Sequence, residues 1–94
     1  MRDVSKIKQD CKTLANKASY ASQGGDIMQA VKRDKAKVLK LAKELRSCGL
    51  ISVERLSIIQ NWAFPIDAPE YKHFASMALP GQIKFLAGRL AVWS

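Results

Sequence analysis

The residues of this chain with the chemistry to build a catalytic or metal centre are Cys11, Cys48 and His73, its two cysteines and single histidine. A zinc site takes about four Cys, His or carboxylate ligands at short spacings, whereas the two cysteines lie 37 positions apart. Neither cysteine has a histidine nearby in the sequence that could activate it as a nucleophile. We therefore expect no catalytic residue, no metal and no cofactor. Both cysteines fall on apolar helix faces, where free thiols behave as small buried hydrophobic groups.

The basic residues carry more information than these three. The 94-residue chain holds 16 Lys and Arg against 8 Asp and Glu, a net charge of +8. Residues 1–46 hold 12 of the bases and 5 of the acids, while residues 47–94 hold 4 and 3. Such a concentrated positive field attracts polyanions, so the expected partner is nucleic acid, and duplex DNA above all. The alternative is a solvated face that keeps the protein soluble and binds nothing.

Four cations of the segment 27–48 should share one side of a helix. At about 100° per residue, the side opposite the apolar residues carries Lys32, Arg33, Lys40 and Lys43. This predicted ridge is about 16 Å long at 1.5 Å per residue, enough to reach two or three backbone phosphates. Lys8 and Lys12, four residues apart on the preceding helix, repel each other and complete the predicted DNA-binding set. Lys37 shares its side of the helix with Glu44, so we expect it to be partly neutralised.

Apolar residues that recur at spacings of three and four predict the helices that hold these cations. We expect helices over residues 4–18 and about 27–48, from Val53 to a stop at Pro65, over a short segment after an Asp67 cap, and from Pro80 to Trp93. Trp62 and Trp93 lie at core spacings, so we expect both to pack rather than to stack on bases.

Polar residues at the helix starts support these boundaries. Asp3 and Ser52 are expected to cap the first and third helices with their side-chain oxygens. The pair Asp26 and Gln29, like Asp67 and Glu70 later in the chain, has the three-residue spacing of a capping box. These signals agree with the apolar pattern, which favours a well-specified bundle.

The end of the second helix is the best-defined boundary. Gly49 can adopt the left-handed conformation just beyond the helix, which places Leu50 against Leu45. Asp34 is the residue that disagrees with this helix, because it lies on the apolar stripe. Either it pairs with a lysine at the rim of the stripe, or the helix begins after it.

Together these elements predict one all-α domain over residues 1–94, a compact bundle of about five helices. The first residues are charged and periodic, unlike a secretory signal, and no apolar run approaches the roughly 20 residues of a membrane span. We expect a cytoplasmic protein that does not bind membranes. The apolar pattern continues to Trp93, one residue before the end at Ser94. Either the chain is a fragment of a longer protein, or its last helix docks elsewhere.

Three stretches resemble the N-terminal core-binding domain of phage-type integrases, members of the tyrosine recombinase family. They are the hydroxyl-rich residues 18–22 ahead of a basic helix, the helix end at 41–50 with its continuation to 56, and the closing turn and helix at 78–93. The resemblance implies a SAM-like bundle that grips one face of a recombination site in duplex DNA. It also implies that the catalytic residues belong to a separate C-terminal domain, so Tyr20 and Tyr71 are not expected to act as nucleophiles.

These observations leave two functions open. The first is a DNA-binding module, either the arm of an integrase that acts in DNA integration and recombination or a stand-alone phage or plasmid protein. The alternative is a small helical interaction subunit, or an inhibitor, within a phage or RNA-guided nucleoprotein assembly. The last helix would then be the docking face for a protein partner or a catalytic domain, and Phe85 and Val92, which lie off its apolar stripe, are the main support.

Overall fold

The computed structural model describes residues 3–16 and 27–94, and every regular element within them is a helix. The helices are α1 (Val4–Ala15), α2 (Ile27–Ser47), α3 (Val53–Asn61), α4 (Tyr71–Ser76) and α5 (Leu79–Trp93). The predicted all-α bundle of about five helices is thereby confirmed. In the described part of the chain, no helix combines the length and apolarity that a membrane span requires.

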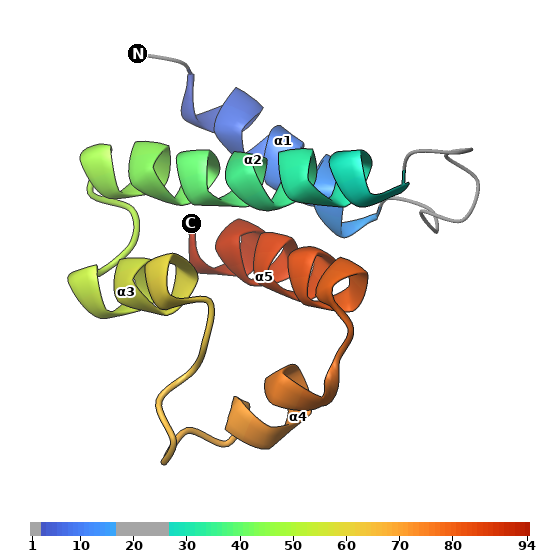
Figure 1. Ribbon diagram of the computed structural model, residues 1–94. Coiled ribbons are helices and arrows are strands. Elements are labelled where there is room, and N and C mark those ends of the chain that lie inside the picture. Colours follow the sequence, from blue (N-terminus) through green and yellow to red (C-terminus); the bar gives the residue numbers. More distant parts are fainter. Residues whose placement is uncertain (1–2, 17–26) are drawn as a thin grey trace.

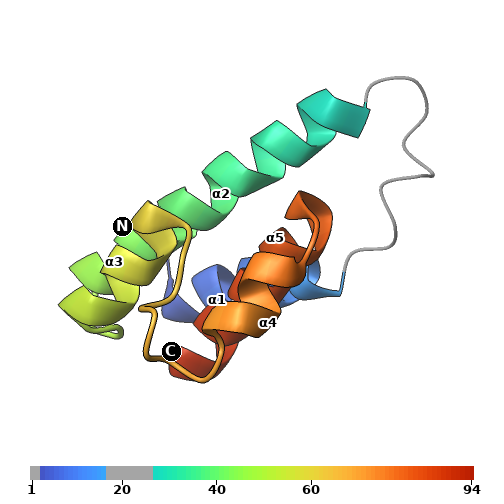
Figure 2. The same cartoon turned by 60° about the horizontal axis from the view of Figure 1, so that its bottom comes forward.

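The helices are arranged around α5, which lies at the centre of the bundle (Figure 1). α1 packs mainly along α5, while α2 contacts α1, α3 and α5. α2 is 21 residues long and runs along one side of the molecule, with α3 beside its carboxyl-terminal end (Figure 2). α4 lies across α5 from α2 (Figure 1). This arrangement leaves the outer face of α2 uncovered by the other described helices.

The core consists of apolar stripes that the helices turn toward one another. Its largest fully buried side chains are Ile7 and Cys11 from α1, Val38, Leu41 and Leu45 from α2, Ile59 from α3, and Ile83, Leu86 and Leu90 from α5. Burying an aliphatic side chain of this size contributes about 1.5–3 kcal/mol, so these stripes fix how α1 and α2 sit on α5. Neither cysteine forms a disulfide; Cys11 is buried, as predicted, whereas Cys48 is only partly buried.

Two of the predicted N-terminal caps are confirmed. The Asp3 side chain accepts a hydrogen bond from the backbone N–H of Ser5 at 3.0 Å, and the Ser52 hydroxyl accepts one from the backbone N–H of Arg55 at 3.2 Å. Each bond satisfies one of the N–H groups that a helix start leaves without a partner inside the helix. The predicted capping box before α2 falls outside the described residues, because it depends on Asp26.

The predicted start of α4 at an Asp67 cap is wrong. Two turns occupy this stretch, closed by hydrogen bonds from the Ala68 N–H to the Pro65 oxygen (2.9 Å) and from the Tyr71 N–H to the Ala68 oxygen (3.1 Å). Ala68 also precedes a proline, and a residue in that position avoids the helical region. The helix therefore begins only at Tyr71, and Glu70 holds the N-cap position without a side-chain hydrogen bond.

Two helices end earlier than predicted, and one begins a residue sooner. α1 stops at Ala15 with Asn16 as its C-cap, whereas the apolar pattern suggested an end at residue 18. Asn favours helix ends because its side chain competes for backbone hydrogen bonds. α3 stops at Asn61, four residues before Pro65. α5 begins at Leu79, with the predicted proline in its first turn.

The predicted carboxyl-terminal end of α2 is confirmed in detail. Gly49 has a φ of 73°, the left-handed conformation. The Leu50 N–H donates to the Leu45 oxygen and the Gly49 N–H to the Arg46 oxygen, both at 3.0 Å. These two bonds define a Schellman motif, which satisfies carbonyl groups at the helix end.

We expect Gly49→Ala to destabilise the fold by about 1 kcal/mol, because an L-residue pays that much or more in the left-handed region. A Cβ at Gly49 would meet nothing within 4 Å, so the loss would come from backbone conformation alone. Gly81→Ala is the matched control, since its Cβ would make only ordinary contacts with Met77, and Ala is favoured over Gly in helices. Urea unfolding should rank Gly81→Ala at or above the parent protein and Gly49→Ala below it. The opposite order would contradict this assignment.

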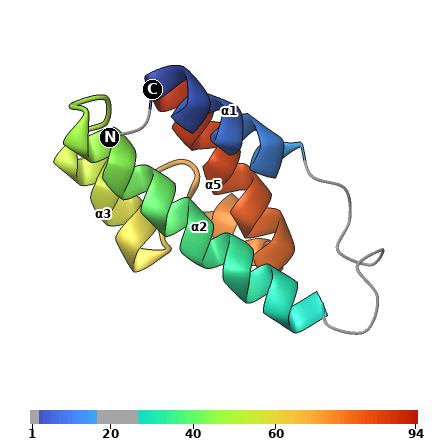
Figure 3. The ribbon, with the colours of Figure 1, turned by 90° about the horizontal axis from the view of Figure 1, so that it is seen from above.

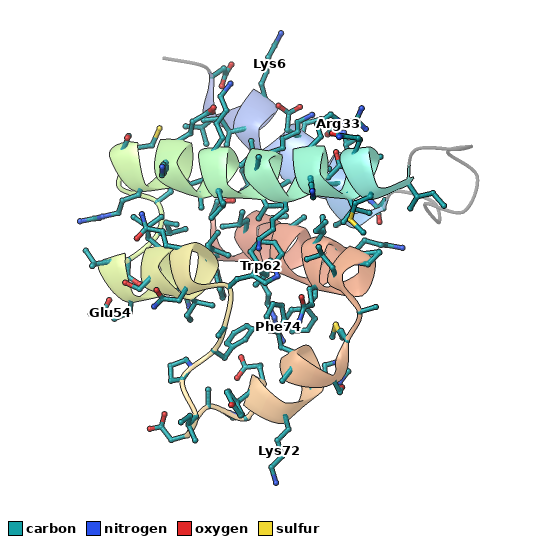
Figure 4. The ribbon with its side chains drawn as sticks, viewed as in Figure 1. Lys6, Arg33, Glu54, Trp62, Lys72 and Phe74 are labelled. Carbon is teal, nitrogen blue, oxygen red and sulfur yellow. The ribbon has the colours of Figure 1, made fainter. Side chains whose placement is uncertain are left out.

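α3 ends at a tryptophan in the left-handed conformation. Trp62 has φ 54° and ψ 40°, which costs a non-glycine residue about 1–2 kcal/mol. Its Nε1–H donates to Oε1 of Gln82 (2.9 Å), and Gln82 Nε2 donates in turn to the carbonyl of Phe74 (3.1 Å). The ammonium of Lys35 lies 5.0 Å from the centre of the indole ring. Trp62 thus links α3 to α2, α4 and α5 (Figure 4), which confirms its predicted packing role.

Candidate nucleic-acid interface

The six cations predicted to bind DNA lie on α1 and α2. Lys32, Arg33, Lys40 and Lys43 are exposed on α2, Lys12 is exposed on α1, and Lys8 on α1 is half-buried. The exposure on α2 has a simple cause, because the buried side of that helix, which includes Val31, Val38 and Leu45, faces the rest of the bundle. The predicted separation of a basic side from an apolar side is therefore present in the structure.

The cations of α2 divide between two parts of its surface. Lys32 and Arg33 are consecutive, so about 100° separates them around the helix axis. Arg33 and Lys40 line hollows that α2 forms with α1, whereas Lys32 and Lys43 line neither hollow. The four cations therefore form two groups instead of the predicted single ridge. Lys32 and Lys43 are the outer pair, and Arg33 and Lys40 lie beside α1.

Two hollows lie between α1 and α2, which run alongside each other (Figure 3). The larger has a volume of about 640 Å³, and its charged residues are Lys12, Arg33, Asp34 and Lys37. The smaller has a volume of about 320 Å³, and its charged residues are Asp10, Arg33, Lys37 and Lys40. Because they share Arg33 and Lys37, the two hollows are adjacent, and we call them together the α1–α2 groove. Four cations against two carboxylates give this groove a net positive charge.

An ion pair explains how Asp34 can lie on the apolar stripe of α2. The residue is only 3% exposed, and its Oδ1 accepts a hydrogen bond from Nε of Arg33 at 3.4 Å as part of an ion pair. Asp34 therefore pairs at the rim of the stripe, and Arg33 is one of its partners. The later helix start is wrong, because α2 already begins at Ile27. The Arg33 side chain stays 66% exposed, so most of it faces solvent.

Among the residues that the structure describes, no ion pair supports the predicted neutralisation of Lys37 by Glu44. Arg33 and Asp34 form the one ion pair whose partners both lie in residues 3–16 and 27–94, so none joins Lys37 to Glu44. Lys37 instead lies in the groove between Arg33 and Lys40. The spacings of four and three residues among these cations place them on one side of a helix. That spacing was present in the sequence and could have identified Lys37.

The predicted cations of α1 differ in position. Lys12 lines the larger hollow, whereas Lys8, one helical turn earlier, lines neither. Lys6 extends from α1 on the side of the molecule where Arg33 lies, while Lys72 points away at the opposite end of the bundle (Figure 4). Lys12 therefore stands next to the cations of α2, and Lys6 is a further cation on that side that the sequence did not single out.

Two other cations of α2 are engaged within the domain. The ammonium of Lys35 lies over the Trp62 ring, and Nη1 of Arg46 donates a hydrogen bond to the Ile51 carbonyl at 3.3 Å. Both contacts connect α2 to the α3 side of the bundle. The cations oriented toward α1 and toward the outer face are the ones whose positive ends remain available to a ligand.

Of the two residues of the last helix that favoured docking, one packs within the domain. The Phe85 ring packs against Phe64 and Phe74, with centroid separations of 5.8 and 5.9 Å, and the Arg89 guanidinium lies 4.9 Å from its centre. Phe85 is therefore held within the domain. Of the two residues that favoured docking, Val92, which is 77% exposed, remains.

Comparisons with known proteins give no information on function, so the argument rests on the basic surface of α2 and α1. No protein-family model, no curated protein and no solved structure matches the chain. Within the part of the chain that the structure describes, no group of three or more His, Cys, Asp and Glu residues could hold a metal ion. The feature with a clear chemical preference is the basic surface of α2 and α1, which suits a ligand with several negative charges.

Proposed function

We propose that this domain binds duplex DNA through the exposed cations of α2, assisted by Lys12 of α1. The observation that carries the proposal is the exposure of Lys32, Arg33, Lys40 and Lys43 on one helix that the rest of the bundle holds in place. Lys and Arg that neutralise phosphates release condensed counterions, which supplies most of the affinity of a basic protein for DNA.

In this binding mode the cations contact backbone phosphates and position the domain on the duplex. Contacts to phosphates set the register and orientation of a protein on DNA but carry no sequence information themselves. From Lys32 to Lys43 the helix spans about 16 Å, about five base-pair steps along a duplex at 3.4 Å each. Such a domain fits the role of a recombinase core-binding arm, which holds one face of the site while a separate domain performs the chemistry. Its free cysteines suit the reducing cytoplasm.

Fluorescence anisotropy of a labelled duplex at two salt concentrations tests the proposal. With four phosphate contacts, the affinity should fall about a hundredfold between about 50 and 200 mM salt, because its logarithm falls by about 0.9 per contact for each tenfold rise in salt. Single-stranded DNA should show a shallower dependence, since its slope per contact is smaller. Failure to bind at low salt, or an affinity that does not change with salt, would rule the proposal out.

A further inference from the structure

The α1–α2 groove differs from the outer pair because it presents cations from two helices to one space. Lys12 approaches from α1, and Arg33 and Lys37 approach from α2. Among the described residues, Arg33–Asp34 is the only ion pair, so neither Lys12 nor Lys37 forms an ion pair with a described carboxylate. A polyanion lying in this groove would meet cations of both helices.

The remaining lining of the larger hollow suits an oxyanion. The side chains of Gln9 and Asn16 line it, and each amide has two N–H donors. The Thr13 hydroxyl donates to the Gln9 carbonyl at 2.9 Å, so its own hydrogen is already used. Phosphate oxygens accept several such bonds at once, and charge-assisted ones are the strongest.

Asp34 gives the groove a positioned arginine. The carboxylate is buried and holds Nε of Arg33, which leaves the two terminal nitrogens on an exposed side chain. A guanidinium presents a planar fork of donors that matches two oxygens of a phosphate. The ion pair offsets part of the Asp34 charge, and the four cations of the groove outnumber its two carboxylates.

We infer that the α1–α2 groove seats phosphate groups of the DNA backbone, with Lys12, Arg33 and Lys37 as their ligands; the inference rests on the proposed function. From Arg33 to Lys40 the groove follows α2 for about 10 Å, about three base-pair steps of a duplex. The groove thus adds a second row of phosphate contacts beside the outer pair. It also gives Lys37, which the sequence suggested was neutralised, a direct role in binding.

The test compares two double variants of the full chain that remove the same charge. Lys12→Gln with Lys37→Gln empties the groove of two ligands, while Lys72→Gln with Lys84→Gln removes two exposed cations from α4 and α5. Gln and Lys have similar helix propensities, so both variants should fold, which circular dichroism verifies. We expect the salt dependence of duplex binding to lose about two units of slope in the groove variant, about one per phosphate contact, and to stay unchanged in the other.

The outcomes separate this inference from the proposed function. If the parent protein binds duplex and the groove variant keeps the parental slope, the groove is not a phosphate seat and DNA binding rests on the outer pair. If the parent protein does not bind duplex, the proposed function fails, and inorganic phosphate becomes the probe. Phosphate-dependent shifts of amide signals at residues 9–16 and 33–40, absent in the groove variant, would then support a seat for phosphate from another source. If phosphate left these amide signals unchanged, the inference of a phosphate seat in the groove would be overturned.

Discussion

Replacing both Lys32 and Lys43 with Gln should weaken duplex binding roughly fiftyfold near 0.1 M salt, because each lost phosphate contact removes about 0.9 units from the salt dependence. These lysines are the outer pair of α2. Both are exposed and neither lines the α1–α2 groove, so the loss should occur without any change in the core. Anisotropy titrations of one labelled duplex at several salt concentrations measure both the affinity and the slope.

The control for this variant is the pair Lys72→Gln and Lys84→Gln, which lowers the net charge equally. Lys72 lies at the end of the bundle remote from α2 (Figure 4), so its loss should leave the slope at the parental value. Equal weakening by the two double variants would mean that net charge, rather than the surface of α2, drives binding. We leave Arg33 unchanged in this comparison because it lines the α1–α2 groove and pairs with the buried Asp34.

Trp62→Ala should lower the free energy of unfolding by about 3 kcal/mol, the lower end of the range for truncating a large aromatic residue, because the indole is only half-buried. The substitution removes the hydrogen bond to Gln82 (2.9 Å), the edge-to-face contact with Phe74 (6.3 Å between centroids) and the contact with Lys35. Since Trp62 links four helices, urea unfolding should still be a single transition with a lower midpoint.

The left-handed conformation of Trp62 makes a second, more specific test possible. In an ordinary helix Gly is less stable than Ala by about 1 kcal/mol, but in the left-handed region Ala carries a steric cost that Gly does not. We therefore expect Trp62→Gly to be more stable than Trp62→Ala by about 1 kcal/mol. The usual order, with Ala the more stable, would show that residue 62 does not hold φ near 54° in solution. Trp62→Phe removes the indole hydrogen bond while it keeps an aromatic ring at this position.

The fold was predictable where local rules agree with one another. The Gly49 end of α2 and the Asp3 and Ser52 caps depend on a few neighbouring residues, and each is present as predicted. The start of α4 was not predictable from the spacing of Asp67 and Glu70 alone, because two turns use up the residues that the capping box needed. The early end of α3 depends on Gln82 and Phe74, which are distant in sequence and hold Trp62 in an unusual conformation.

The sequence predicted which cations of α2 are exposed, but it did not predict that some of them line a groove with α1. Helical periodicity placed Lys32, Arg33, Lys40 and Lys43 on the exposed side of α2, as the structure has them. The groove arises only from the packing of α1 beside α2, so its pairing of Lys12 with Lys37 was not evident from either helix alone. Asp34, which pairs with Arg33, is likewise buried only because neighbouring helices cover the stripe.

Mapping duplex binding onto the amide spectrum of the isotope-labelled domain is the most direct test of the account. The proposal predicts that substoichiometric duplex shifts or broadens signals of α2 around Lys32–Lys43 and of the second half of α1, including Lys12. It also predicts that signals of α4 and of the turns before it, around Lys72, stay in place, and that raising the salt concentration reverses the changes. Changes confined to α3, α4 and the exposed end of α5, with α2 unaffected, would contradict a DNA-binding surface on α2.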